Sequence, residues 1–94
     1  MTPEGKIKRV VSQELKSRSD MYYFMPVPGG YGEATLDYVG CYRGQYFAIE
    51  TKKPGGEPTD RQKHTIRRMS ASGAKVFVID GDLTELKHWL DTTT

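Results

Sequence analysis

The sequence is poor in features that mark several large classes of protein. Cys41 is the only cysteine among the 94 residues, so an internal disulfide is excluded and a reducing compartment is indicated. No apolar run approaches the ~20 residues that a membrane-spanning helix needs. The first residues also lack the apolar segment of a signal peptide. We therefore expect a cytoplasmic protein that does not associate with membranes.

Histidine is scarce as well. His64 and His88 have no histidine or cysteine partner at metal-binding spacing, so both are expected on the solvated surface. The length allows a single domain, residues 1–94, in which about 60–65% of the unfolded surface is buried. A homodimer would add buried surface to this modest core. Cys41 is expected to be a buried strand residue.

The net charge is only +2, but it is unevenly distributed. Residues 1–18 carry +3 and residues 52–75 carry +5, whereas residues 19–51 and 76–94 carry −3 each. Basic helices beside an acidic region indicate a polyanionic partner whose chemistry requires carboxylates. An ordinary solvated surface is the alternative, and charge alone does not exclude it.

Hydrophobic periodicity and turn residues predict seven elements in the order αβββαβα. Thr2-Pro3-Glu4 resembles a helix start, and Thr59–Gln62 and Asp82–Glu85 both match the capping-box pattern. Gly73 is expected just after the second helix. The predicted ranges are helix 3–17, strand 22–25, loop 26–34, strands 35–42 and 45–52, turn 53–58, helix 59–72, strand 75–79, and a last helix starting near 82, with residues 91–94 frayed.

The second and third strands are apolar on both faces, which predicts helices on both sides of the sheet. The fold class is therefore α/β, with a mixed four-stranded sheet whose last strand is parallel to the third. One sheet face is predicted to carry Asp37, Val39, Cys41, Tyr46, Ala48 and Glu50, and the other Leu36, Tyr38, Tyr42, Phe47 and Ile49.

The register of the central hairpin predicts a charged site. If Arg43-Gly44 is a two-residue turn, opposed residues have numbers that sum to 87, so Asp37 faces Glu50. Lys52 lies two residues beyond Glu50 and projects from the same face. Two carboxylates suit Mg²⁺ or Mn²⁺, and the ammonium group could polarise a water or stabilise an anionic transition state.

Several other side chains are candidates for this site. Glu4 and Glu14 both fall near the edge of the apolar stripe of the first helix, and either could aim a carboxylate at the sheet. The alternatives are a favourable helix-dipole position for Glu4 and a rim position for Glu14. Gln62 is on the inward face of the second helix, where the capping box explains part of its role equally well. Among the tyrosines, which mainly pack in the sheet, those that could reach a polyanionic partner such as a nucleic acid are Tyr22, Tyr23 and Tyr31.

Asp37 followed by Glu50-Thr51-Lys52 resembles the signature of PD-(D/E)xK nucleases. The continuation through residues 49–62, IETKKPGGEPTDRQ, resembles the virus-type replication-repair nuclease (VRR-NUC) domain of that superfamily. The αβββαβ order also matches the restriction-endonuclease-like core. This sequence has Ala34-Thr35-Leu36-Asp37 where members usually have Gly-x-Pro-Asp, so the metal-binding aspartate is kept while the glycine and proline are not.

The resemblance implies a Mg²⁺- or Mn²⁺-dependent DNA endonuclease without an organic cofactor, acting as a homodimer on branched DNA such as flaps or Holliday junctions. It implies that the metal ligands are Asp37, Glu50, the Thr51 backbone carbonyl and Glu4, with Lys52 as the catalytic lysine and Gln62 near the site. The basic surface expected to hold DNA comprises Lys53, Arg61, Lys63, Arg67 and Arg68. A non-catalytic nucleic-acid-binding module of the same fold, or a nuclease acting on RNA, is the alternative.

Overall fold

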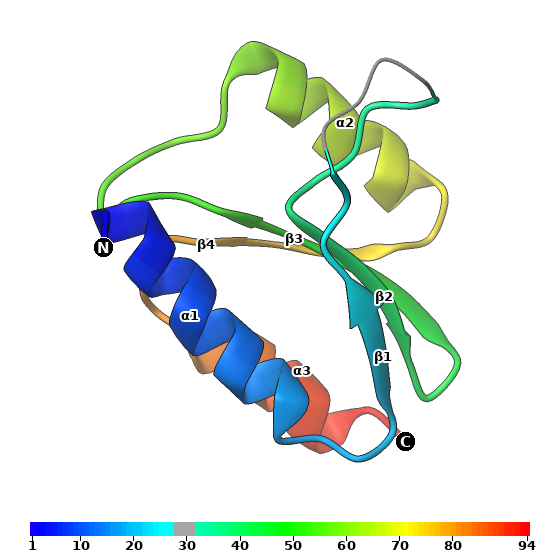
Figure 1. Cartoon of the computed structure of the whole chain (residues 1–94). Coiled ribbons are helices and arrows are strands. Elements are labelled where there is room, and N and C mark those ends of the chain that lie inside the picture. The colour runs from blue at the N-terminus through cyan, green and yellow to red at the C-terminus, as the bar shows by residue number, and fades with distance from the viewer. Residues whose placement is uncertain (28–31) are drawn as a thin grey trace.

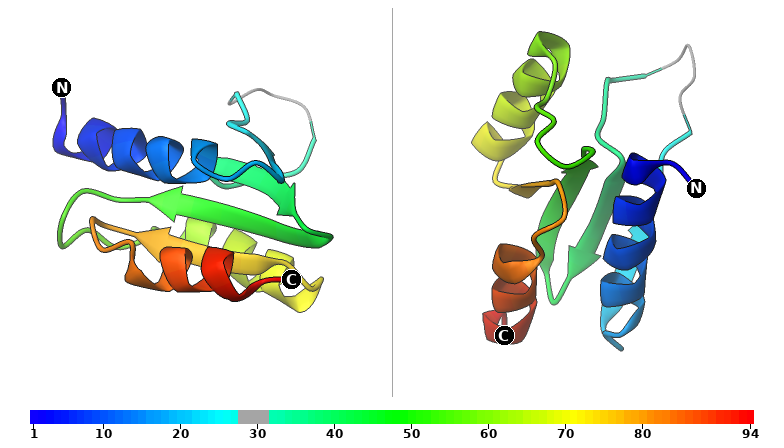
Figure 2. Two further views of the ribbon diagram at one scale, coloured as in Figure 1. Left: turned by 90° about the horizontal axis from the view of Figure 1, so that it is seen from below. Right: turned by 90° about the vertical axis from the view of Figure 1, so that its left-hand side faces the viewer.

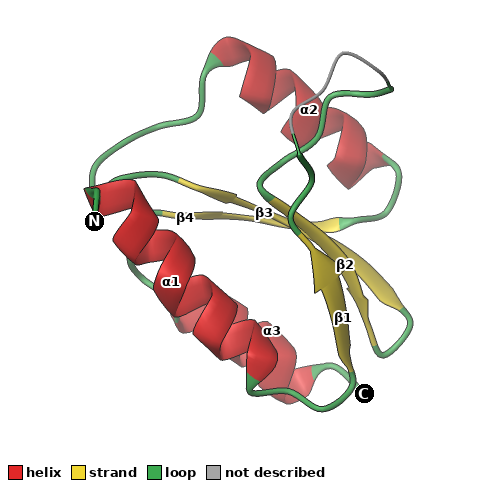
Figure 3. Cartoon of the chain, viewed as in Figure 1, coloured by secondary structure: helices red, strands yellow, loops and turns green. Residues whose placement is uncertain are grey.

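The computed structural model describes residues 1–27 and 32–94 and shows a four-stranded sheet packed between helices (Figures 1 and 3). The middle of the predicted loop 26–34, including Tyr31, lies outside the described residues. The elements are α1 (Pro3–Lys16), β1 (Met21–Phe24), β2 (Tyr38–Tyr42), β3 (Gln45–Thr51), α2 (Asp60–Ala71), β4 (Lys75–Ile79) and α3 (Thr84–Thr92).

The sheet has the order β1-β2-β3-β4. The first three strands are antiparallel neighbours, and β4 is parallel to β3 because α2 carries the chain back across the sheet. This topology confirms the predicted αβββαβ core with an added C-terminal helix, and it places β3 between neighbours on both sides. The start of β2, next to Asp37, and the end of β3, next to Glu50 and Lys52, therefore lie in the interior of the sheet.

The larger part of the core lies between the sheet and the helices α1 and α3. In the left view of Figure 2 these two helices lie in front of the sheet and α2 lies behind it. Trp89 of α3 contacts the rings of three core aromatic residues at centroid distances of 5.6–5.8 Å. The buried side chains of this cluster are Ile7, Val11, Leu15, Tyr38, Tyr42, Phe47, Ile49, Phe77, Ile79, Leu86 and Leu90.

The opposite face of the sheet has a smaller core and is only partly covered. Helix α2 packs over β3 and β4, where Ile66 and Met69 meet a cluster formed by Val39 and Ala48. Cys41 is exposed, so the prediction that it is buried is wrong. The reason is that Cys41 lies opposite Tyr22 and Tyr46 in the sheet, beyond the part that α2 covers, and its two neighbours are 68% and 50% exposed.

The second strand is shorter than predicted. It begins at Tyr38 rather than at residue 35, so the alternation of faces does not extend back to Leu36. Leu36 consequently packs with Val39 and Ala48 on the α2 side instead of with Tyr38, which corrects its predicted face. The other strand bounds differ from the prediction by at most one residue at each end, with β1 at 21–24 and β3 ending at Thr51.

The helix boundaries follow local capping. Thr59 and Gln62 form the predicted capping box of α2, and Gly73 adopts a φ of 101° just after its end. The second predicted box does not form: the N-cap of α3 is Leu83, and the Asp82 carboxylate instead accepts a hydrogen bond from the Thr84 amide at 2.9 Å. Helix α3 also continues to Thr92, through two of the residues expected to fray. Across the described ranges, every helix is too short or too polar to cross a bilayer.

Candidate active site

The hairpin between β2 and β3 has the register that the sequence predicts. Arg43 and Gly44 have φ values of 50° and 81°, as expected for a two-residue turn that matches the twist of the strands. Tyr42 pairs with Gln45 and Tyr38 pairs with Ile49. Asp37 directly precedes the last pair of this register, and its charge and its backbone N–H act on the Glu50 carboxylate near the end of β3.

Asp37 is held in place by the residue after Glu50. Its Oδ2 accepts hydrogen bonds from the Thr51 backbone N–H at 2.9 Å and from the Thr51 hydroxyl at 2.7 Å. Its Oδ1 lies 3.9 Å from the ammonium nitrogen of Lys8 on α1. Thr51 is completely buried, so the carboxylate is positioned by a rigid part of the sheet. Oδ2 of Asp37 is thus fixed by Thr51, and Oδ1 faces the ammonium group of Lys8.

Glu50 is a buried carboxylate with a single nearby cation. It is 4% exposed, and its Oε2 lies 3.5 Å from the Lys52 ammonium nitrogen. Burial raises the pKa of the Glu50 carboxyl above its usual value, and the negative charge of Asp37 raises it further, whereas Lys52 lowers it. The protein therefore disfavours the charged form of Glu50. A divalent cation at this position would reverse that preference because it would compensate the buried charge.

The two glutamates of α1 lie in different surroundings. The Glu14 carboxylate accepts a hydrogen bond from Arg18 at 2.9 Å and lies 3.9 Å from the Lys87 ammonium group. Glu4 is ten residues closer to the N-terminus, about 15 Å along the helix. It lines a cavity of about 470 Å³ with Lys52 and Lys53, so Glu4 is the α1 carboxylate on the side of the candidate site.

Asp37 and Glu50 fit a hard divalent cation in the type of donor atom that they supply. Carboxylate oxygens are the ligands that Mg²⁺ and Mn²⁺ accept, and the buried Glu50 is a site where a positive charge would be stabilising. No three side chains of histidine, cysteine, aspartate or glutamate come together as a metal-binding group in residues 1–27 and 32–94. The donor set of the described chain is therefore a carboxylate pair, to which backbone oxygens and water would add.

Gln62 is engaged in capping α2. The side-chain Oε1 of Gln62 accepts a hydrogen bond from the Thr59 backbone N–H at 2.9 Å, and the Gln62 backbone N–H donates to the Thr59 hydroxyl at 3.2 Å. This arrangement explains the position of the glutamine without any reference to the carboxylate pair. Gln62 is partly exposed at the first turn of α2, which follows the loop leading from Lys52.

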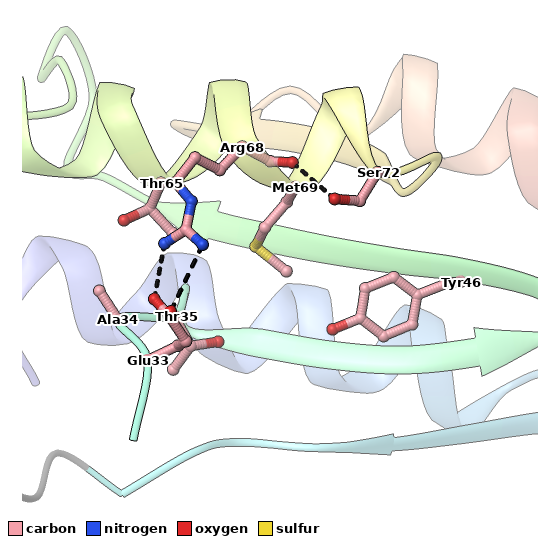
Figure 4. A pocket seen from close by; sticks show the side chains of 8 residues that line it. All are labelled: Glu33, Ala34, Thr35, Tyr46, Thr65, Arg68, Met69 and Ser72. Atoms are coloured by element: carbon pink, nitrogen blue, oxygen red, sulfur yellow. Dashed lines mark hydrogen bonds and ion pairs between the residues drawn. The ribbon is translucent and has the colours of Figure 1, made fainter. Parts of the chain in front are cut away.

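The predicted DNA-binding residues lie on the exposed surface of α2 and of the loop before it. Arg68 of this set donates two hydrogen bonds to the Glu33 carboxylate, at 2.6 and 3.4 Å, which lowers the pKa of Glu33. Figure 4 shows this pair beside a cleft of about 300 Å³ that Tyr46 and Met69 also line. The cleft is lined by none of the predicted catalytic residues. All members of the set are exposed: Lys53, Arg61, Lys63, Arg67 and Arg68.

The tyrosines predicted to reach DNA divide into two groups. Tyr22 is 68% exposed on the open face of the sheet, whereas Tyr23 is partly buried against the ring of Tyr38 at a centroid distance of 5.8 Å. Tyr31 lies outside the described residues. Tyr22 therefore remains a candidate for a surface contact, and Tyr23 packs in the fold.

Lys8 was not singled out from the sequence, although a signal was present. Lys8 follows Glu4 by four residues, so both project from the same side of α1, near the buried Ile7. Because Glu4 was a candidate for the metal site, Lys8 on the same side of the helix could have been expected near that site too. Its proximity to Asp37 depends on the angle at which α1 crosses the sheet, which periodicity does not give.

The fold and the site together define an αβββαβ sandwich with two carboxylates and a lysine at one end of its sheet. A solved structure described as a "VRR_NUC domain" matches this chain with a TM-score of 0.77 and 19% sequence identity, over 100% of both chains. The chain therefore has the fold of a VRR_NUC domain, which confirms the predicted fold class. No protein-family model matches the sequence, and no curated protein matches it.

Proposed function

We propose that this protein is a metal-dependent endonuclease that hydrolyses phosphodiester bonds in DNA. The observation that carries the proposal is the convergence of Asp37, Glu50 and Lys52 at the end of the β2–β3 hairpin, within a fold matching that of a VRR_NUC domain. The basic surface of α2 and of the preceding loop supports a polyanionic substrate.

Each residue of the site has a distinct role in the proposed reaction. Asp37 and Glu50, with the Thr51 carbonyl and Glu4 as further oxygen donors, would hold Mg²⁺ or Mn²⁺. When bound, such an ion supplies charge stabilisation and lowers the pKa of a water. Lys52 is anchored by the hydrogen bond from its backbone N–H to the Ile79 carbonyl at 2.9 Å. Its ammonium group orients the attacking water or stabilises the anionic transition state.

The proposed substrate is branched DNA, and the proposed active form is a homodimer. One small basic face contacts few phosphates, whereas two faces related by a dyad would contact more. The open face of the sheet supports dimerisation because it leaves apolar side chains exposed on β1 and β3, among them Tyr22, Phe24 and Tyr46. Light scattering tests the dimer: a monomer that persists when flapped or four-way-junction DNA is added would contradict it.

The specific observation that favours a second function is that, in residues 1–27 and 32–94, no third acidic, histidine or cysteine side chain lies close enough to form a metal-binding group with the carboxylate pair. A non-catalytic nucleic-acid-binding module of the same fold would need no metal. The buried Glu50 beside Lys52 argues for the nuclease, because a binding module gains nothing from a carboxylate in a site that disfavours its charge.

A cleavage assay distinguishes the two functions. Supercoiled, flapped and four-way-junction DNA, together with a single-stranded RNA, are incubated with Mg²⁺, Mn²⁺ or a chelator. The nuclease cuts DNA with metal and not with chelator, while the Asp37→Ala and Glu50→Ala variants bind DNA but do not cut it. A folded wild type that binds DNA and cuts none of the substrates would instead be the binding module. Cleavage of the RNA alone would reassign the substrate.

A further inference from the structure

The carboxylate pair is accompanied by two lysines rather than one. Lys52, directly after β3, lies 3.5 Å from Glu50, and Lys8 of α1 lies 3.9 Å from Asp37. Two carboxylates and two ammonium groups give these four side chains a formal charge of zero. A divalent cation that approaches Asp37 and Glu50 therefore meets four side chains of balanced charge, with Glu4 of α1 as the further carboxylate of the proposed site.

We propose that Lys8 is a positioning residue that balances Asp37 before a cation binds and then binds a substrate phosphate, so that cation and phosphate bind cooperatively. This inference rests on the proposed nuclease function and adds a residue and a coupling to it. The atom over which Lys8 and a cation compete is Oδ1 of Asp37, because Oδ2 accepts two hydrogen bonds from Thr51.

Lys8 is the lysine that can leave its carboxylate. Its side chain is 37% exposed, whereas that of Lys52 is 16% exposed and follows directly from the end of β3. An ammonium group on a flexible four-carbon stem can move toward solvent without disturbing the fold. Because Lys8 lies one helical turn from Glu4, it is near the 470 Å³ cavity that Glu4, Lys52 and Lys53 line. Glu57 also lines this cavity, so a phosphate would bind on the side formed by Lys52, Lys53 and, once it has left Asp37, Lys8.

The charge balance gives the direction of the coupling. A divalent cation alone leaves the four side chains and the ion with a charge of +2, which favours an anion. A phosphate that binds Lys8 draws it from Asp37 and lowers the repulsion that a cation meets. Linkage requires that each ligand strengthens the binding of the other by the same factor.

The experiment measures the affinity of the protein for Mn²⁺ by titration calorimetry, with and without saturating thymidine 5′-monophosphate, which an endonuclease cannot hydrolyse. For the wild type we expect the nucleotide to tighten Mn²⁺ binding by about 5- to 150-fold, the usual range of such couplings. In Lys8→Met we expect Mn²⁺ to bind at least about fivefold more tightly without nucleotide, because a cation about 4 Å from Asp37 has been removed. The factor by which the nucleotide tightens Mn²⁺ binding should then be smaller in Lys8→Met than in the wild type.

Matched variants separate this role from a change in net charge. Lys6→Met removes an exposed lysine of the same helix on another side and should retain the wild-type affinities. Lys8→Arg should retain the wild-type coupling. A Lys8→Met protein with unchanged or weaker Mn²⁺ binding and an unchanged nucleotide effect would overturn the proposal while leaving the nuclease intact. Absence of Mn²⁺ binding in every variant, with nucleotide present, would overturn both.

Discussion

At the scale of single residues, the site combines a carboxylate that is well stabilised with one that is not. Asp37 accepts two hydrogen bonds from Thr51, whereas Glu50 is buried beside Asp37 with Lys52 as its partner. The proposed cation site would have this kind of cost, because the buried charge of Glu50 would be fully compensated only with the cation present. The two carboxylates should therefore respond differently to neutral substitutions.

Glu50→Gln is expected to stabilise the fold near neutral pH while abolishing cleavage. The pKa of Glu50 is raised in the folded protein, so its charged form opposes folding above the usual pKa of a glutamate, and this penalty disappears at lower pH where both states are protonated. For a chain of this size a gain of 1 kcal/mol raises Tm by roughly 4–8 °C. Thermal unfolding at pH 7.5 and at pH 3.5 measures the difference.

Glu33→Gln provides the matched control for that variant. The ion pair with Arg68 lowers the pKa of Glu33, so its charged form favours folding and the neutral variant should not gain stability at pH 7.5. A Glu50→Gln protein with a lower Tm than the wild type in metal-free buffer at pH 7.5 would show that Glu50 is stabilised rather than strained by its surroundings.

Thr51→Val is expected to weaken the site without changing the fold. The substitution keeps the shape of the side chain but removes the hydroxyl that donates to Asp37 at 2.7 Å. A hydrogen bond to a charged group contributes about 1.5–3 kcal/mol, so we expect about 10- to 100-fold slower cleavage and weaker Mn²⁺ binding. Thr51→Ser retains the hydroxyl and should retain most activity. Equal cleavage rates for Thr51→Val and the wild type would rule out the proposed positioning role of the hydroxyl.

At the scale of elements, the hairpin and α2 were the parts most fully predictable from the sequence. Arg43-Gly44 fixes the turn and therefore the register, and Thr59 with Gln62 fixes the start of α2. Both features depend on residues close together in sequence. The predicted face of Leu36 was wrong because the prediction assumed a regular strand beginning at residue 35, whereas β2 begins at Tyr38.

The capping box predicts how Gln62 variants behave. Gln62→Ala removes the acceptor for the Thr59 N–H and should lower the free energy of unfolding by about 1 kcal/mol. Gln62→Glu preserves the acceptor and should retain stability, because glutamate forms the same box. Chemical denaturation measures both. A Gln62→Ala protein as stable as the wild type would contradict the structural role and return the residue to the candidates for the active site.

At the scale of the whole molecule, the sheet is covered unevenly. The sequence shows apolar residues on both faces of β2 and β3, but it does not show how far α2 extends across the sheet. Cys41 was wrongly predicted to be buried because the sequence does not show that α2 stops short of it. Lys8 was missed because its contact with Asp37 depends on the packing angle of α1. Long-range placement of helices is thus the part that local patterns do not supply.

The exposed thiol of Cys41 reports on this open face. In dilute protein we expect maleimide labelling of Cys41 at nearly the rate measured in denaturant, because the side chain is exposed between Tyr22 and Tyr46. At higher protein concentration the proposed dimer should slow the labelling. Mass spectrometry follows the reaction. Strong protection in a dilute monomer would contradict the open sheet, and labelling that does not depend on concentration would place the dimer interface elsewhere.

In the proposed function, Asp37, Glu50 and Lys52 form the active site of a metal-dependent nuclease. The most direct test compares cleavage of supercoiled and branched DNA by the wild type and Lys52→Ala in the presence of Mg²⁺ or Mn²⁺. We expect the wild type to cut only with metal, and the variant to bind DNA with similar affinity but to cut about 100- to 1000-fold more slowly. Cleavage by Lys52→Ala at the wild-type rate would contradict the catalytic role of Lys52, and cleavage by the wild type in chelator would contradict the metal dependence.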